Sequence, residues 1–174
     1  MTSKIYLACG LTHVPRESFQ RYVTFIHELA EKLTHSLGAE VKYALLHSDP
    51  QLANKPIQER AKLCYLWDRA MVEWADLVIA ECSYPSTGVG IELQIAEQHG
   101  TPIIICFESI SSTAALPVDY NNPDGSQHHL QIGDGHVTLM ALGLPTVFSV
   151  VSYINPYDGM AKIMAAVELL ERNQ

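Results

Sequence analysis

A glutamate without a charge partner follows a glycine-rich turn near the middle of the chain. The turn contains Pro85, Gly88 and Gly90, and a helix is predicted to follow it. Glu92 lies near the start of this helix, and its neighbours three and four positions away are glycine, valine, isoleucine and alanine. A carboxylate on the inner face of a first helical turn is better explained as a working group of a site than as a surface charge. The simpler alternative is a first-turn glutamate that complements the helix dipole.

The same turn has the donors that an anion needs. Ser86 and Thr87 place hydroxyl groups beside the predicted helix start, where backbone N–H groups lack acceptors within the helix. The positive end of the helix dipole adds to these donors. The segment therefore predicts a phosphate site a few residues from Glu92.

A second carboxylate interrupts an apolar helix face. The pattern after Pro56 predicts a helix whose apolar stripe includes Cys64, Met71 and Val72, and Asp68 lies within that stripe. No cation three or four positions away compensates Asp68. Either Asp68 belongs to a polar site, or it lies at the edge of the stripe and reaches water.

Short apolar segments predict the strands that must position these groups. Strands are expected over residues 4–9, 40–46, 77–80, 103–107 and 146–152. Helical periodicity predicts crossover helices over 19–37, after Pro56, after the glycine-rich turn and after Asn155. Five strands that alternate with helices indicate a doubly wound α/β fold, flavodoxin-like or Rossmann-like, with a five-stranded parallel sheet.

In such a fold the first and third strands lie side by side at the point where the strand order reverses, which is where ligands bind. Two groups of residues should then face each other across one crevice. These are Tyr6, Gly10, His13 and Arg16 on one side, and Ser86, Gly88, Gly90 and Glu92 on the other.

Between residues 108 and 145 the chain is rich in loop-forming residues, which predicts an insertion. We expect a small hairpin there, with residues 127–132 and 136–140 flanking a turn at 133–135. Three histidines and Asp134 in this region suggest a metal site. We reject that interpretation, because the adjacent His128 and His129 point apart on a strand and no familiar ligand spacing is present.

Length and charge exclude several classes of partner. A chain of 174 residues suits one domain, 1–174. Its net charge is -8 and its Lys and Arg are scattered, which argues against a nucleic-acid polymer or an anionic membrane. The four cysteines have no close pairing, and neither a signal peptide nor an apolar run of about 18 residues is evident, so we expect a cytoplasmic protein.

The opening strand and the central segment resemble the nucleoside 2-deoxyribosyltransferase superfamily, over about residues 4–107 and more loosely 146–170. The strand at 5–10 and the segment 76–92 carry this resemblance. Within the superfamily, the chain is most similar to the 2′-deoxynucleoside 5′-monophosphate N-glycosidases. That similarity comes from the sequence at 85–93, from Asp68 eight residues before Asp76, and from the Arg16-Glu17 pair.

The resemblance implies hydrolysis of the N-glycosidic bond of a (deoxy)nucleoside 5′-monophosphate, which releases free base and a 5-phosphosugar. Glu92 would be the nucleophile that forms a covalent glycosyl intermediate, and Asp68 would assist departure of the base. Tyr6 would orient Glu92 through its hydroxyl. This agrees with an oxocarbenium-like transition state, which needs a carboxylate beneath the sugar and a proton source at the base.

The resemblance also implies a 5′-phosphate site at Ser86 and at the N–H groups near Gly88 and Gly90. It implies a homodimer and no cofactor or metal. In two places the chain departs from the monophosphate hydrolases: His13 stands where their first loop carries a cation, and the insertion at 108–145 is longer.

Two other functions stay open. A related enzyme could transfer deoxyribose to a second base instead of to water. A non-catalytic nucleotide-binding domain could use the same fold, although the retention of both Glu92 and Asp68 argues against it.

Overall fold

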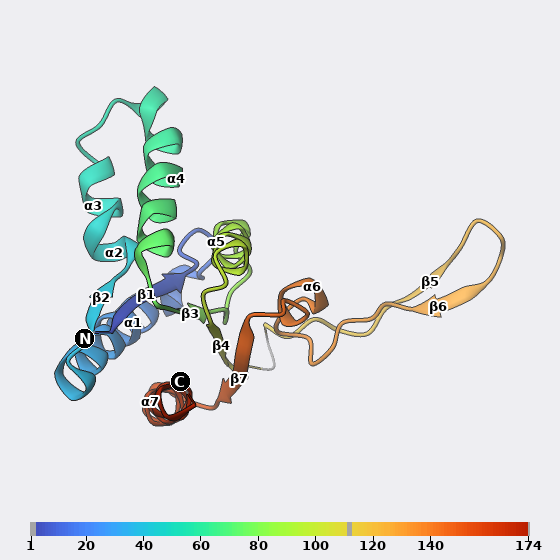
Figure 1. Ribbon diagram of the computed structural model, residues 1–174. Helices are drawn as coiled ribbons and strands as arrows, with labels where there is room; N and C mark the ends of the chain where they lie inside the picture. Colours follow the sequence, from blue (N-terminus) through green and yellow to red (C-terminus); the bar gives the residue numbers. More distant parts are fainter. Residues whose placement is uncertain (1–2, 111–112, 174) are drawn as a thin grey trace.

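A five-stranded parallel sheet with the order β2-β1-β3-β4-β7 forms the centre of the computed structural model, which describes residues 3–110 and 113–173 (Figure 1). The strands are β1 (Lys4–Cys9), β2 (Glu40–Lys42), β3 (Leu77–Glu81), β4 (Ile103–Glu108) and β7 (Val147–Tyr153). This order confirms the predicted doubly wound α/β fold, with the first and third strands adjacent where the strand order reverses.

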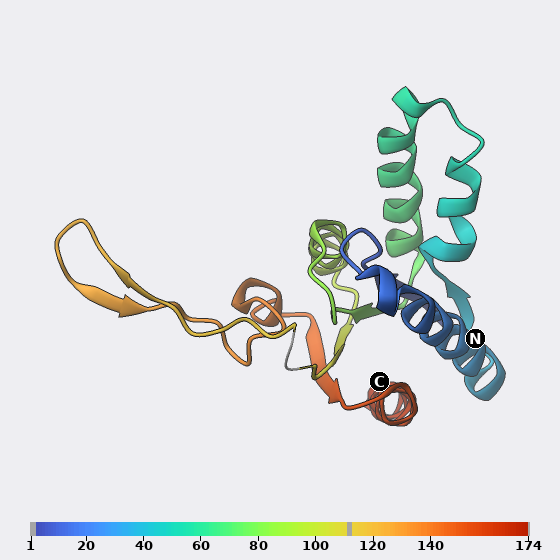
Figure 2. The same ribbon diagram turned by 180° about the vertical axis from the view of Figure 1, so that it is seen from behind.

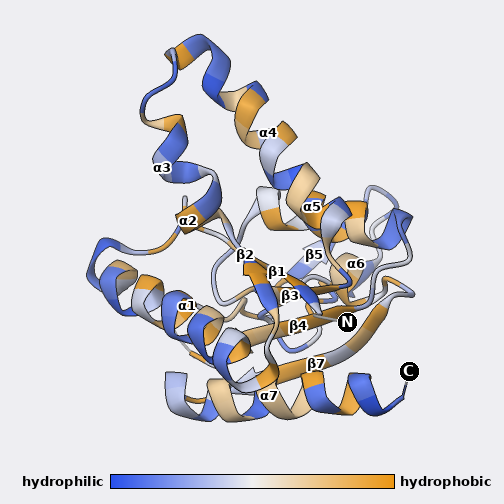
Figure 3. Ribbon diagram, turned by 60° about the vertical axis from the view of Figure 1, so that its left-hand side comes forward, coloured by the Kyte–Doolittle hydropathy of each residue, from blue (hydrophilic) through white to orange (hydrophobic). Residues whose placement is uncertain are grey.

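Helices cover both faces of the sheet, as Figure 3 shows. α1 (Arg16–Leu37) and α7 (Pro156–Arg172) pack on one face, and α4 (Ile57–Trp74) and α5 (Thr87–Gln98) pack on the other. Among the described residues, no helix combines the length and the apolar character that a bilayer crossing requires.

Alternation along β1 decides which side chains face each layer. Ile5 and Leu7 join the core beneath α1 and α7, whereas Tyr6 and Ala8 join the core beneath α4 and α5. All four side chains are fully buried. β1 therefore aims the hydroxyl of Tyr6 toward the layer that contains α5.

The strand predicted over 40–46 is wrong beyond Lys42. β2 pairs with β1 over three residues only, and α2 (Ala44–His47) and α3 (Asp49–Leu52) follow. The amides of Leu46 and His47 donate to the carbonyl of Tyr43, which begins α2. The apolar run at 44–46 suits a helix as well as a strand, and periodicity cannot separate the two in so short a segment.

The hairpin predicted around residues 133–135 is also wrong. The insertion instead pairs β5 (Asp119–Asn121) with β6 (Gln127–His129), and the turn between them contains Gly125 at φ 83°. Asp124 accepts the amide of Ser126, which stabilises this turn. Residues 136–140 lead into α6 (Leu139–Leu142) instead of forming a strand.

The hairpin of residues 118–130, here named the arm, extends away from the sheet in both opposite views (Figures 1 and 2). Its strands are exposed along their whole length. Ser111 and Ser112, which belong to the predicted insertion, lie outside the described residues.

Candidate active site

A cavity of about 410 Å³ opens at the carboxyl ends of β1 and β3. Four segments line it: the loop after β1, the α2–α3 segment, α4 and the start of α5. It brings together most of the residues that the sequence singled out: His13, Asp68, Ser86, Thr87, Gly88 and Glu92.

Glu92 has one satisfied and one unsatisfied oxygen. The hydroxyl of Tyr6 donates to Oε1 at 2.8 Å. Oε2 is buried, and no described residue bonds to it. Burial raises the pKa of Glu92 to about 8, the hydrogen bond from Tyr6 opposes the rise, and the charge of Asp68 adds to it. The carboxylate therefore gains from any positive charge that develops beside it.

Asp68, on α4, also has one satisfied and one unsatisfied oxygen. The thiol of Cys64 donates to Oδ2 at 3.3 Å, while Oδ1 is buried without a partner among the described residues. The alternative in which Asp68 simply extends into water does not fit this burial. Because native proteins satisfy nearly all buried polar atoms, two half-satisfied carboxylates in one cavity indicate a site built for a ligand.

Ser86 is the N-cap of α5. Its Oγ accepts the amide of Val89 at 3.2 Å, and its carbonyl accepts the amide of Gly90 at 3.2 Å. The hydroxyl proton of Ser86 is still available to donate, and helix geometry leaves the first N–H groups, those of Thr87 and Gly88, without acceptors in the helix. These donors lie on the wall of the cavity, and a helix N-terminus of this kind favours an anion.

The other predicted residues lie outside the cavity lining. A Cβ on Gly10 would lie 2.6 Å from the Cβ of Ser86, so Gly10 permits the close approach of two loops. Gly90 is open to solvent one turn along α5, and Arg16 begins α1 as an exposed residue. The structure therefore does not bring Arg16 to the carboxylates.

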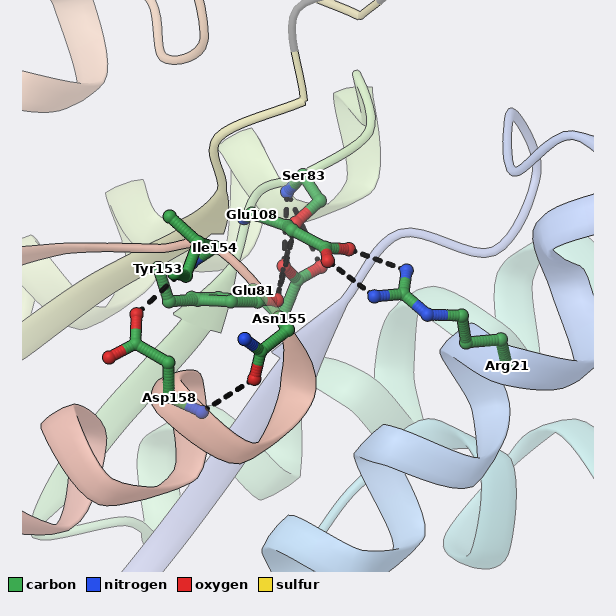
Figure 4. Close-up of polar contacts among 8 residues, drawn as sticks. All are labelled: Arg21, Glu81, Ser83, Glu108, Tyr153, Ile154, Asn155 and Asp158. Carbon is green, nitrogen blue, oxygen red and sulfur yellow. Dashed lines mark hydrogen bonds and ion pairs between the residues drawn. The ribbon is translucent and has the colours of Figure 1, made fainter.

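Sequence reasoning missed a buried carboxylate at the end of β3 (Figure 4). Glu81 is completely buried and accepts hydrogen bonds from the Ser83 amide, the Ser83 hydroxyl and the Tyr153 hydroxyl, the last at 2.8 Å. The amide of Glu108 donates to Ser83 Oγ at 2.7 Å, and Arg21 pairs with the Glu108 carboxylate. This network holds the loop that leads to Ser86. The sequence signal that could have revealed this network is Glu81 itself, a charged residue at the end of an apolar strand.

The α2–α3 segment contributes four further lining residues, Ala44, Ser48, Asp49 and Leu52. The sequence pattern predicted a strand to residue 46 and did not predict that this segment would line the site. Over residues 3–110 and 113–173, no group of three or more His, Cys, Asp and Glu is placed to hold a metal ion.

No protein-family model and no curated protein sequence matches the chain. Solved structures do resemble it. The CMP N-glycosidase BcmB of Clostridium botulinum superposes with a TM-score of 0.56 at 17% identity, over 94% of this chain and 98% of that one. A conserved protein from Enterococcus faecalis V583 gives a TM-score of 0.55 at 17% identity, over 95% and 99%.

A 2-deoxyribosyltransferase from Bacillus psychrosaccharolyticus aligns over 60% of this chain and 72% of its own, with a TM-score of 0.46 at 21% identity. That score is too low to compare folds. Over nearly its whole length, this chain shares the fold of a CMP N-glycosidase.

Proposed function

We propose that the protein belongs to the nucleoside 2-deoxyribosyltransferase superfamily and hydrolyses the N-glycosidic bond of a (deoxy)nucleoside 5′-monophosphate. The products are a free base and a 5-phosphosugar. The observation that carries this proposal is that two half-satisfied carboxylates, Glu92 and Asp68, line one cavity together with the start of α5. The fold shared with a CMP N-glycosidase supports it.

In the proposed reaction Glu92 attacks the anomeric carbon. The hydrogen bond from the Tyr6 hydroxyl to Oε1 orients the carboxylate for this attack. A C–O bond forms as the C–N bond breaks, and the electron pair of that bond leaves with the base. Water then attacks the anomeric carbon and gives a proton to Asp68, which has by then lost its own to the base. The C–O bond to Glu92 breaks, which releases the 5-phosphosugar and restores both carboxyl groups, as in retaining glycosidases.

Asp68 provides the proton that the departing base takes up. Asp68 lines the same cavity as Glu92, and we infer that the two carboxyl groups lie on either side of a bound sugar. The 5′-phosphate binds the Ser86 hydroxyl and the first amides of α5. The positive charge that develops on the sugar stabilises ionised Glu92, whose pKa burial otherwise raises.

The direct test is to incubate the protein with a panel of nucleoside monophosphates and the matching nucleosides, with and without a free acceptor base, and to separate the products. Base and 5-phosphosugar from monophosphates alone support the proposal. Exchange of the base when an acceptor is present identifies a transferase. Binding without any product identifies a nucleotide-binding domain. Glu28→Gln, a change at an exposed residue of α1, is the matched control for Glu92→Gln.

We also propose that the protein is a homodimer joined through the arm. A two-stranded hairpin is only marginally stable by itself. The arm and its flank expose Leu116 at 75%, Val118 at 52%, Tyr120 at 45% and Leu130 at 51%. A second copy would cover these apolar side chains. Light scattering should give twice the mass of the chain, and replacing Val118, Tyr120 and Leu130 by serine should give a folded monomer.

A further inference from the structure

A second cavity, of about 480 Å³, lies behind the α2–α3 segment, on the side away from the candidate active site. It is lined by Lys42, His47, Gln51, Lys55, Trp67, Ala70 and Met71. This lining contains two lysines and a histidine but no carboxylate. In a chain of net charge -8, such a lining favours an anionic ligand.

Contacts hold the side chain of Lys42 and the backbone at Lys55 in place. Lys42 Nζ lies 3.9 Å from the centre of the Trp74 ring, with Glu40 Oε1 3.8 Å away on the solvent side. The guanidinium of Arg60 donates to the carbonyls of Lys55 at 2.8 Å and Ala53 at 3.0 Å, which fixes the backbone at Lys55.

The opposite wall is apolar. Trp67, Ala70 and Met71 are three and four positions apart on α4 and form one face of that helix. Trp67 presents a flat aromatic surface on which a planar ring can stack. The cavity volume lies within the range of small-molecule sites.

We propose that this cavity binds a nucleotide as an effector, with its phosphate at Lys42 and Lys55 and its base against Trp67. The site is separate from the candidate active site, and its occupation does not depend on the proposed function.

Two elements connect the cavities. On α4, Trp67 faces the second cavity while Asp68 faces the active site. On the α2–α3 segment, His47 and Gln51 face the second cavity, whereas Ser48 and Asp49 face the active site. A ligand that sets the spacing between α3 and α4 therefore also sets the position of Asp68. This coupling rests on the proposed function.

Tryptophan fluorescence reports on this cavity directly. The chain has two tryptophans: Trp67 lines the cavity, and Trp74 lies beneath Lys42. Neither lines the candidate active site. We would titrate the Glu92→Gln protein with AMP, adenosine and inorganic phosphate, and excite the tryptophans at a wavelength that the nucleotides do not absorb.

We expect a saturable change with AMP and a much weaker response to adenosine or phosphate. Lys55→Glu should weaken AMP binding by about tenfold or more, the usual effect of losing a hydrogen bond to a charged group. Ser86→Ala should weaken it by much less than Lys55→Glu does, and the exposed control Lys32→Glu should leave it unchanged. The proposal is overturned if AMP causes no change, or if Ser86→Ala reduces the response as much as Lys55→Glu does.

Two further readouts separate the remaining outcomes. If a second copy of the chain covers this cavity, Lys55→Glu will change the mass in light scattering but not the AMP response, and the site is not an effector site. In the protein that retains Glu92, AMP should change the rate of base release from another nucleotide. This effect should disappear in the Lys55→Glu variant. Absence of base release from every nucleotide, with fluorescence binding intact, would refute the proposed function and leave this site standing.

Discussion

Glu81 and Glu92 are two carboxylates buried at the same edge of the sheet, but on opposite faces of it. Glu81 accepts hydrogen bonds from Ser83 and Tyr153, so its neighbours satisfy it. Glu92 accepts one hydrogen bond, and its Oε2 has no partner among the described residues. Burial raises the pKa of both groups. Burial alone therefore does not separate the two carboxylates, whereas the unsatisfied oxygen of Glu92 and its place in a cavity do.

The largest expected difference between the two carboxylates is in activity. Glu92→Gln should lower kcat by about 10³-fold or more, because it removes the proposed nucleophile. Glu81→Gln should retain measurable base release, because it changes a residue that supports a loop. Steady-state kinetics on both variants test this contrast. Comparable kcat losses in both would mean that the comparison does not separate the two roles.

The second expected difference is in pH dependence. The pKa of Glu92 in the folded protein is raised to about 8, above its unfolded value. Its stabilising contribution is therefore fully present below the ordinary carboxyl pKa and is lost as pH rises through about 8. Relative to Glu92→Gln, the wild-type protein should lose on the order of 3 kcal/mol between pH 4 and pH 9. Urea unfolding of both proteins across this range measures the difference, and parallel curves would contradict the assignment.

Glu81→Ala should destabilise the protein by about 2 to 3 kcal/mol, because it leaves the hydroxyls of Ser83 and Tyr153 buried without their acceptor. The midpoint of chemical denaturation measures this loss. Glu28→Ala, at an exposed residue of α1, provides the control, since surface changes typically fall within about 0.5 kcal/mol. A loss no larger than the control would show that the network around Glu81 contributes little to stability.

Ser86→Ala should have the smallest effect. It should lower both the stability of the protein and its preference for a phosphorylated substrate. Loss of the N-cap of α5 should cost about 1 kcal/mol of stability. Loss of a donor to phosphate should narrow the preference for a monophosphate over its nucleoside by about 1 to 3 kcal/mol. The ratio of kcat/KM for the two substrates measures this preference. An unchanged ratio would remove Ser86 from the proposed phosphate site.

The sequence predicted the central strands well because parallel strands covered on both faces are continuous apolar runs. The prediction was wrong at residues 44–46, because a short apolar run suits a helix as well as a strand. It was also wrong between residues 122 and 135, because more than one segment there can form the turn of a hairpin. In the site, helical spacing found Glu92 and Asp68 because both interrupt an apolar neighbourhood.

Hydrogen bonds between side chains of different strands could not be predicted from the sequence. Glu81 meets Tyr153, which lies 72 positions further along the chain, and no local pattern encodes that distance. Arg16 was predicted to face Glu92 from the strand order, and the Arg16-Glu17 pair contributed to the family resemblance. The orientation of the loop after β1 instead leaves Arg16 exposed at the start of α1.

The close approach of Gly10 to Ser86 also has a consequence for folding. The two residues are distant in sequence, and their loops meet only after β1 has paired with β3. Helices form quickly from local contacts, whereas pairing of distant parallel strands is slow. During refolding we therefore expect phosphate binding to appear in the slow phase in which the sheet forms, well after the helical signal. Anion binding would then report that folding is complete.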